Sequence, residues 1–442
     1  MNGRVVSCRA AAVYNIDSRF ARRLSPPYLT RLPESPRMIH RFAPFMACLA
    51  LISGAAAAAS NWPQFRGPDG QGHVPPGHYP LEWSETKNIT WKTPIEGLGW
   101  SSPVLQGDQI WLTTATDEAH SLRAVCLNRT SGKIVHDVEV FHKDDPGKIH
   151  SKNSHASPTP ILEGDRVYVH FGAHGTACLT TDGKIVWRNE ELVYNHRHGP
   201  AGSPIIYHDL LILSCDGTDV QFVVALDKRT GKVKWKKSRD GRMAYSTPLM
   251  INVDGLDQLV STGGDSVIAY EPLTGKEIWH VTYDGYSEVP RPVVGDGMIF
   301  ICTGYDTPWL YAVRLGGKGD VTESHVAWKL KKGAPLNPSP LLLGDELYIV
   351  SDRGVATCLD AKSGEERWQQ RLGGNFSASP VFADGRIYFL DEVGLTTVIA
   401  PGREFKELAK NQLEGRTLAS PAFVDGVIFL RTDTHLYRIE EK

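Results

Sequence analysis

Residues 203–235 read SPIIYHDLLILSCDGTDVQFVVALDKRTGKVKW, and this stretch decides the fold. It opens on a Ser-Pro pair, continues through alternating apolar runs, and ends with Thr230-Gly231 and, four residues later, Trp235. Runs in which apolar and polar residues alternate predict half-buried β-strands. Gly231 supplies the positive φ that a tight turn needs, and Thr230 can hydrogen-bond nearby backbone. The stretch therefore predicts four short strands joined by turns.

The same unit returns along the whole chain. Each copy begins with a Ser-Pro pair or its equivalent, found at Ser102-Pro103, Thr159-Pro160, Ser203-Pro204, Thr247-Pro248, Arg291-Pro292, Ser339-Pro340, Ser379-Pro380 and Ser420-Pro421. Subtraction of the proline numbers gives steps of 57, 44, 44, 44, 48, 40 and 41 residues. Four strands in such a unit make one propeller blade, which buries its faces only against neighbouring blades. We therefore predict an all-β, eight-bladed β-propeller with four strands per blade.

A large side chain on the last strand of each unit is expected to fill the space between blades. Most units place tryptophan there, at Trp187, Trp235, Trp279, Trp328 and Trp368. His136 takes this position in the first unit, whereas the seventh unit has Ala400-Pro401-Gly402 in place of the turn and no tryptophan after it. These two units are degenerate copies of the blade.

The last unit, residues 420–440, has room for three strands only. Its missing outer strand should carry a tryptophan, and Asn88-Ile89-Thr90-Trp91-Lys92 fits that requirement. We predict that this N-terminal strand closes the last blade and so joins the two ends of the propeller.

The N-terminal region has the pattern of a secretory signal. A basic start at Met38 precedes the apolar run 42–52 and the small residues 55–59, so we expect cleavage near Ala59. Residues 1–37 are interpreted as lying upstream of the true start codon, with a composite targeting segment as the alternative. The apolar run is shorter than the roughly 20 residues that span a bilayer.

These features predict a periplasmic or secreted protein whose mature chain has no transmembrane span. We divide the chain into an upstream segment and signal over 1–59, an N-terminal leader over 60–87 and the propeller over 88–442. A formal net charge of −2 and the lack of charge runs exclude the classes of protein that wrap nucleic acid or lie on anionic membranes. We expect a monomer.

The pattern Ser-Pro, Gly-Asp, Leu-Asp-x-x-Thr-Gly-Lys and Trp, clearest in residues 203–235, resembles the repeat of the pyrroloquinoline-quinone-like β-propeller family. Residues 61–70, NWPQFRGPDG, resemble the leader of exported bacterial members. The family includes quinone-dependent alcohol dehydrogenases, which hold a calcium ion beside the quinone in the central channel. It also includes non-enzymatic propeller lipoproteins of outer-membrane assembly and propellers attached to receptor kinases.

The resemblance implies no cofactor by itself. The quinone enzymes carry two adjacent cysteines, and the five cysteines that follow residue 60 are well separated, so we interpret them as small buried hydrophobes. A calcium ion needs carboxylate and amide oxygens that we do not map onto this chain. We therefore expect no cofactor, with pyrroloquinoline quinone and calcium as the alternative.

The loops before the Ser/Thr-Pro pairs should converge on one mouth of the central channel. We select as ligand-binding candidates the polar residues His155, His198, Arg242, Tyr245, Glu288, Arg291, Asn337 and Arg416. Arginine and histidine donors suit an anionic ligand such as a phosphate, an anionic sugar or a tricarboxylate quinone. Ordinary solvated loops are the alternative, and for Glu288 it is a salt bridge to Arg291. We predict no metal site, although His196 and His198 could face one ion together.

These observations predict a non-catalytic, extracytoplasmic propeller that binds or scaffolds a protein partner or an anionic ligand, and no nucleic acid. A quinone-dependent dehydrogenase of alcohols or sugars is the alternative, and a glycan-binding or glycan-hydrolysing propeller is the third hypothesis. Catalytic residues are not identifiable from the sequence.

Overall fold

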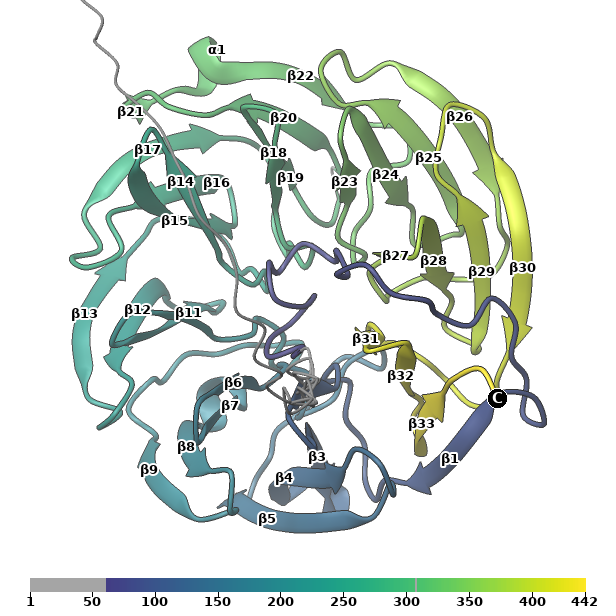
Figure 1. Ribbon diagram of the computed structural model, residues 1–442. Coiled ribbons are helices and arrows are strands. Elements are labelled where there is room, and N and C mark those ends of the chain that lie inside the picture. Colours follow the sequence, from purple (N-terminus) through teal and green to yellow (C-terminus); the bar gives the residue numbers. More distant parts are fainter. Residues whose placement is uncertain (1–60, 307) are drawn as a thin grey trace, which may run out of the picture. The chain divides into compact units, whose positions relative to one another are not determined.

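The computed structural model describes residues 61–306 and 308–442, which form eight antiparallel sheets arranged as the blades of one propeller (Figure 1). The predicted upstream segment and signal over 1–59 lie outside the described residues. The prediction of an eight-bladed, all-β propeller with four strands per blade is confirmed. No helix in the described part of the chain is long and apolar enough to cross a membrane.

The first four blades follow one another along the chain. Blade 1 contains β2 (Val104–Gln106), β3 (Gln109–Thr116), β4 (Ser121–Asn128) and β5 (Ile134–His142); blade 2 contains β6 (Ile161–Glu163), β7 (Arg166–His170), β8 (Thr176–Thr180) and β9 (Ile185–Asn189). Blade 3 contains β10 (Ile205–Tyr207), β11 (Leu210–Asp216), β12 (Gln221–Asp227) and β13 (Val233–Ser238); blade 4 contains β14 (Leu249–Val253), β15 (Leu256–Gly263), β16 (Ser266–Tyr270) and β17 (Glu277–Thr282).

The remaining blades complete the ring. Blade 5 contains β18 (Val293–Gly295), β19 (Met298–Cys302), β20 (Leu310–Arg314) and β22 (Val326–Leu330); blade 6 contains β23 (Leu341–Leu343), β24 (Glu346–Val350), β25 (Val355–Asp360) and β26 (Glu366–Arg371). Blade 7 contains β27 (Val381–Ala383), β28 (Arg386–Leu390), β29 (Leu395–Ala400) and β30 (Lys406–Gln412); blade 8 contains β31 (Ala422–Val424), β32 (Val427–Arg431), β33 (His435–Ile439) and β1 (Ile89–Pro94). Short irregular segments hold the 3-10 turns η1 (Asp117–Ala119) and η2 (Gly172–His174), the helix α1 (Thr322–His325) and β21 (Gly319–Asp320), which adds in parallel to β17.

The predicted closure of the ring by an N-terminal strand is confirmed. β1 pairs antiparallel with β33, from Ile89 opposite Ile439 to Pro94 opposite His435. Trp91 of β1 donates from Nε1 to the carbonyl oxygen of Arg129 in blade 1 (3.2 Å). The strand therefore completes blade 8 and docks that blade on blade 1.

The outer-strand tryptophans join each blade to the next. Trp187 donates to the carbonyl oxygen of Lys228 and Trp235 to that of Pro272, both at 3.0 Å, and each acceptor lies in the turn of the following blade. A Cβ on Gly231 would lie 2.5 Å from the Trp187 ring, so this turn must have a glycine for close packing. Trp279 differs, because it donates to Gln258 of its own blade.

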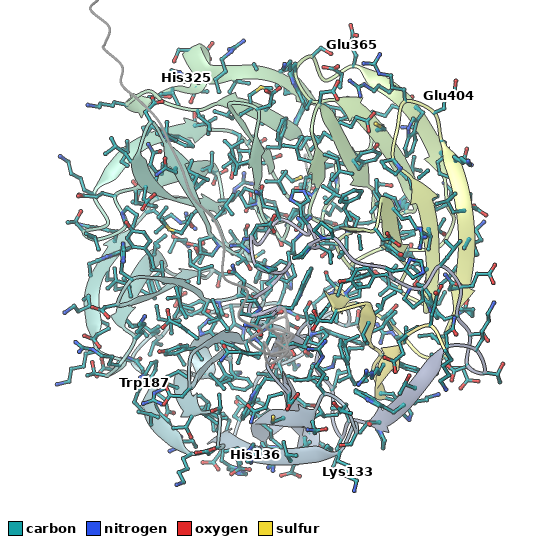
Figure 2. The ribbon with its side chains drawn as sticks, in the orientation of Figure 1. Lys133, His136, Trp187, His325, Glu365 and Glu404 are labelled. Atoms are coloured by element: carbon teal, nitrogen blue, oxygen red, sulfur yellow. The ribbon has the colours of Figure 1, made fainter. Side chains whose placement is uncertain are left out.

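His136 occupies the tryptophan position of blade 1. A Cβ on Gly183 of blade 2 would lie 3.1 Å from its ring, which also stacks on Trp111. Figure 2 shows His136 and Trp187 at the edge of the ring, on the outer strands of blades 1 and 2. The smaller imidazole ring of His136 therefore packs between blades 1 and 2, where the other blades have the indole ring of a tryptophan.

Blade 7 has Ala409 at the tryptophan position, opposite Val398. Trp83 of the leader supplies the missing ring: it is 3% exposed and stacks on Tyr388 of β28, with ring centroids 6.3 Å apart. Its backbone N–H donates to Asn411 Oδ1 (2.8 Å). The leader is thus part of the propeller core.

We expect Trp83→Ala to lower the free energy of unfolding by about 3–5 kcal/mol, because it removes a buried indole and leaves a cavity against Tyr388. Urea unfolding followed by tryptophan fluorescence and circular dichroism measures this change. Leu273→Ala, at a side chain that is 58% exposed, is the control and should change the stability by less than about 0.5 kcal/mol. Equal effects of the two substitutions would contradict the assignment.

Candidate functional site

The Ser/Thr-Pro pairs form two hydrogen-bonded arcs around the central channel. The backbone N–H of one pair donates to the hydroxyl of the pair in the next blade, at 2.9–3.0 Å, along Ser102–Thr159–Ser203–Thr247 and along Arg291–Ser339–Ser379–Ser420. The motif that carries the repeat is therefore a structural connection between blades. Residues available for binding lie in the loops beside it.

One end of the channel is closed by residues 61–74, which we call the floor segment. It crosses the centre of the ring (Figure 1). Trp62 exchanges backbone hydrogen bonds with Leu105 in blade 1, and the Leu162 N–H of blade 2 donates to Pro63. On the other side of the ring, the Phe382 N–H donates to Gly72, and His73 Nε2 lies 2.8 Å from the Leu342 carbonyl oxygen. The floor segment thus joins blades that are far apart in the sequence.

The opposite end of the channel is a pocket of about 710 Å³, which we call the mouth pocket. All eight blades contribute to its walls, and Phe65 of the floor segment reaches it from the other end. Its basic residues are His150, Lys152, Arg197, His198 and Arg353, and its large apolar or aromatic residues include Trp100, Met243, Tyr245, Tyr286 and Tyr305. The pocket combines positive charge with aromatic surface.

Among the described residues, Asp352 is the one carboxylate that lines the mouth pocket. It accepts hydrogen bonds from the Leu336 N–H (2.7 Å) and from the Asn337 side-chain amide. Burial raises its pKa, whereas these two donors and Lys152 lower it. Lys152 pairs with Glu392 (2.8 Å). The remaining field at the mouth comes from Arg197 and Arg353, which suits an anionic group.

Three of the predicted site residues line the mouth pocket: His198, Tyr245 and Asn337. His198 contacts Tyr245 and His150, with ring centroids 6.1 and 5.6 Å apart. Tyr245 donates to the His196 carbonyl oxygen (3.1 Å). His198 and Tyr245 therefore belong to one connected wall between blades 2 and 4, whereas Asn337 lies across the ring, before blade 6.

Other predicted site residues stand outside the pocket. Arg242 forms ion pairs with Asp265 and with Asp284 (2.7 Å). Arg416 lies over the Trp100 ring, 5.6 Å from its centroid. His155 is buried, with Nε2 2.8 Å from the Pro146 carbonyl oxygen. Arg242 is thus already neutralised, and His155 supports a loop.

The predicted salt bridge between Glu288 and Arg291 is wrong. Glu288 is fully buried, and neither of its carboxylate oxygens has a hydrogen-bond partner in the described structure. Burial raises its pKa well above the ordinary value. Arg291 turns to the opposite end of the channel, where it donates to the carbonyl oxygens of Phe65 (3.0 Å) and Gly70 (3.2 Å). The backbone carbonyls of the floor segment replace the expected carboxylate.

Sequence reasoning missed the contribution of a second set of loops. Tyr305 lies between the second and third strands of blade 5, and Asp352 and Arg353 lie between those strands of blade 6. These loops open on the same end of the channel as the loops before the Ser/Thr-Pro pairs. The strand order of a blade could have indicated this, because alternate connections of an antiparallel sheet share one edge.

A cluster of imidazoles lies behind the wall of the mouth pocket. His174 lies between His155 and His196, with ring centroids 5.6 and 5.3 Å away. Burial lowers the pKa of His170 to about 3 and that of His174 and His196 to about 4, and neighbouring imidazoles add to the effect. These rings are therefore neutral at pH 7. No group of three or more His, Cys, Asp or Glu side chains in the described residues has the geometry to hold a metal.

The described residues do not fit the calcium ion of the family's dehydrogenases. A calcium ion takes several oxygen ligands, usually with more than one carboxylate, and the mouth pocket supplies only Asp352 among its described residues. Its oxygens already accept two hydrogen bonds. The cysteines of the described chain are buried and free: Cys126, Cys178, Cys215, Cys302 and Cys358.

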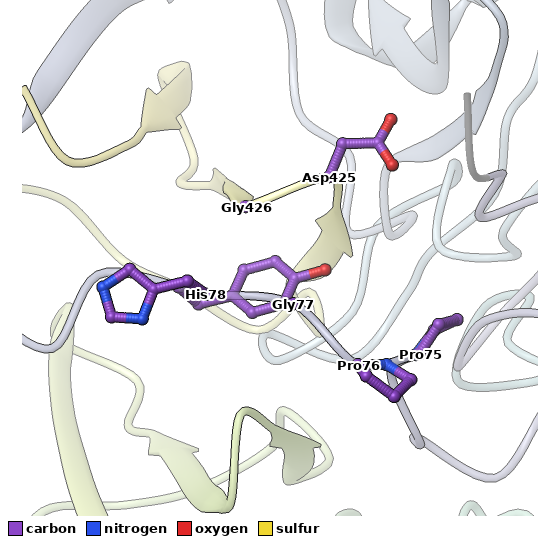
Figure 3. Close-up of a pocket in the computed structure, with 7 residues that line it drawn as sticks. Pro75, Pro76, Gly77, His78, Asp425 and Gly426 are labelled. Carbon is purple, nitrogen blue, oxygen red and sulfur yellow. The ribbon is translucent and has the colours of Figure 1, made fainter. Parts of the chain in front are cut away.

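A second, smaller cleft of about 340 Å³ lies between residues 75–79 of the leader and the turn that joins β31 to β32 (Figure 3). His78 in this cleft lies 2.9 Å from Glu441 and 3.2 Å from Asp384. Asp425 on the other side pairs with Arg129 (2.8 Å). The charges of these residues are engaged within the propeller, so the mouth pocket is the better candidate site.

A family model described as outer membrane protein assembly factor BamB matches residues 82–249, 222–316 and 319–400. The chain belongs to this family. The matched ranges run from the leader beside β1 to β29, the third strand of blade 7, so membership of the BamB family rests on the repeat itself. The predicted resemblance to the pyrroloquinoline-quinone-like propellers is thereby confirmed.

An outer membrane protein assembly factor BamB from Burkholderia pseudomallei (strain K96243) is 31% identical to this chain over 103 residues. The match covers 23% of this chain and 26% of that protein, so it spans about a quarter of the relative's length.

Solved structures share the fold with this member of the BamB family. BamB from Moraxella catarrhalis matches with a TM-score of 0.55 and 13% identity over 79% of this chain and 99% of that one. Quinohemoprotein alcohol dehydrogenase ADHIIG from Pseudomonas putida HK5 matches with a TM-score of 0.62 and 11% identity over 86% and 80%. A europium-containing methanol dehydrogenase gives 0.60 and 11% over 84% and 89%. Identities at this level show the fold alone.

Proposed function

We propose that this chain is a non-catalytic, extracytoplasmic scaffold in outer-membrane protein assembly, and that it holds an acidic group of its protein partner at the mouth pocket. The observation that carries the proposal is the charge of that pocket, because Arg197 and Arg353 from separate blades line it and Asp352 is the one carboxylate among its described lining residues. Membership of the BamB family supports the same role. A soluble anionic molecule bound by the same two arginines is the other ligand that this pocket could hold.

We further propose that the mature chain acts in the periplasm as a monomer without a cofactor. The donor set of the mouth pocket supports the last point, because it has too few carboxylates for a hard cation. Incubation of the purified protein with pyrroloquinoline quinone and calcium should give no quinone that coelutes on gel filtration. Coelution together with dye reduction by an alcohol would overturn the non-catalytic proposal.

The assembly role is tested in the bacterium that encodes the chain. Deletion of the gene should lower the amount of folded β-barrel protein in the outer membrane, and the wild-type gene should restore it. The double variant Arg197→Ala/Arg353→Ala should fail to restore it, because each lost charge-assisted contact costs about 1.5–3 kcal/mol, roughly tenfold or more in affinity.

Arg314→Ala is the matched control, since Arg314 is exposed at the end of β20 and away from the mouth pocket. It should restore assembly fully, and both variants should melt within about 2 °C of the wild type. Full restoration by the double variant would reject the mouth pocket as the binding site. An unchanged outer membrane after deletion would reject the assembly role.

A further inference from the structure

Two arginine side chains are buried together at the floor segment. Arg66 belongs to this segment and is 1% exposed, and Arg291 precedes β18 and is 3% exposed. Both bond the same short stretch of backbone: Arg66 Nη2 donates to Gln71 (2.7 Å), and Arg291 Nη1 donates to Phe65 and Gly70. Their positive charges therefore lie close together in a region without water contact.

Neither guanidinium has a carboxylate within ion-pair distance among the described residues. The partners of Arg66 and Arg291 are backbone carbonyl oxygens, including those of Pro380 (3.5 Å) and Pro248 (3.2 Å). Arg66 Nε and Nη1 are buried and have no hydrogen-bond partner in the described structure. The protein therefore leaves two donor groups of one buried cation without an acceptor.

This arrangement is costly in the absence of a counter-charge. Burial of an ion without a partner costs several kcal/mol, and arginine does not escape by losing its proton. Burial lowers the pKa of Arg66 to about 9 and that of Arg291 to about 10, and the charge of Arg291 lowers that of Arg66 further. Asp69 acts on both from a distance, but its oxygens are engaged by His73 (2.7 Å) and the Gln71 N–H (2.8 Å).

Arg431 shows that burial alone does not produce this pattern. It is also buried without a carboxylate, yet its Nη1 donates to the Ser101 carbonyl oxygen, the Ser101 hydroxyl and the Thr113 carbonyl oxygen. Burial is the one cause that lowers its pKa, so no second cation acts on it. Arg431 Nε is likewise buried without a hydrogen-bond partner, so the pair at the floor segment differs by having two cations that act on each other.

We propose that Arg66 and Arg291 bind one small monovalent anion of the size of chloride at the floor segment, at the unpaired Nε–H of Arg66. The anion would neutralise one of the two charges and hold the leader in the channel. The packing limits its size, because a Cβ on Gly72 would lie 3.3 Å from Arg66 Nε. The site is separate from the mouth pocket and independent of the function proposed for it.

The test is thermal unfolding of the whole protein at constant ionic strength, with sodium gluconate replaced stepwise by sodium chloride. We expect the Tm to rise by about 4 °C and to saturate as for one site, because an anion that binds only the folded state stabilises it. Arg66→Gln should lose this rise, and the exposed control Arg314→Gln should keep it. A Tm that does not respond to chloride, or responds equally in Arg66→Gln, would overturn the proposal.

A second measurement does not depend on the variant folding. Crystals of the wild-type protein grown in bromide should show an anomalous peak within hydrogen-bond distance of Arg66 Nε. Bromide peaks confined to the protein surface would overturn the site. A Tm rise with phosphate but not with chloride would overturn the assignment of a halide-sized anion. Neither result bears on outer-membrane assembly, so the two proposals fail independently.

Discussion

Deletion of residues 61–95 will abolish cooperative unfolding. The deletion removes β1 and with it the outer strand of blade 8, which leaves β33 as an unpaired edge. It also removes Trp62, Tyr79 and Trp83, all at most 3% exposed, from the core that joins blades 1, 7 and 8. Each large aromatic side chain lost from a core costs about 3–5 kcal/mol, so the three together cost about 9–15 kcal/mol, which is comparable to the roughly 5–15 kcal/mol that stabilises a typical domain.

Circular dichroism and calorimetry against the chain that begins at Ser60 measure the effect. A third chain, which begins at Glu85, keeps β1 and lacks the floor segment and Trp83. We expect it to unfold cooperatively at a lower Tm, because the ring is still closed by hydrogen bonds between β1 and β33. If the chain without residues 61–95 melted like the reference, the closure would contribute no stability.

Acidification from pH 7.5 to pH 5 will destabilise the protein through the buried histidines. In the folded state the pKa of His170 lies at about 3 and that of His174 and His196 at about 4, against about 6.5 in an unfolded chain. A histidine with a lowered folded pKa contributes stability that is present above pH 6.5 and is lost as the pH falls towards its folded pKa. At pH 5 each ring accounts for a loss of at most about 2 kcal/mol.

Urea unfolding of the wild type and of the His174→Gln/His196→Gln double variant at the two pH values tests this prediction. The variant should lose less stability than the wild type between pH 7.5 and pH 5, by at most about 4 kcal/mol. His208→Asn, at an exposed position in the turn between β10 and β11, should follow the wild type. Glu288 has a raised pKa and opposes the loss, but it is present in every variant and cancels. Equal losses in all three proteins would show that the cluster does not carry the pH dependence.

The repeat by itself determined the architecture. The number of blades, the four strands of each, the outer-strand tryptophans and the strand around Trp91 could all be predicted, because they depend on local period and turn chemistry. His136 and Trp91 show how far this extends, since each was expected at the position where it packs on a turn glycine of the next blade. Contacts between neighbouring blades repeat at a nearly constant spacing in the chain, so the sequence displays them.

Only the tertiary structure decided which polar side chains face the channel. The sequence placed Arg242 and Arg291 at the mouth, but Arg242 pairs with Asp265, and Arg291 bonds the floor segment at the other end. Each guanidinium donates to acceptors on other segments: Arg242 to the Asp265 carboxylate and Arg291 to the Phe65 carbonyl oxygen. Arg291 and Phe65, for example, are 226 residues apart.

The path of the leader through the propeller is the clearest feature that only the tertiary structure decides. Residues 61–87 have no repeat period, and their hydrogen bonds reach acceptors and donors in blades 1, 2, 5, 6 and 7. No local pattern encodes a segment that must fit the space left when the ring closes. The sequence alone therefore determined the blades and their closure, whereas the floor of the channel, the substitute Trp83 and the buried arginine pair depend on the closed ring.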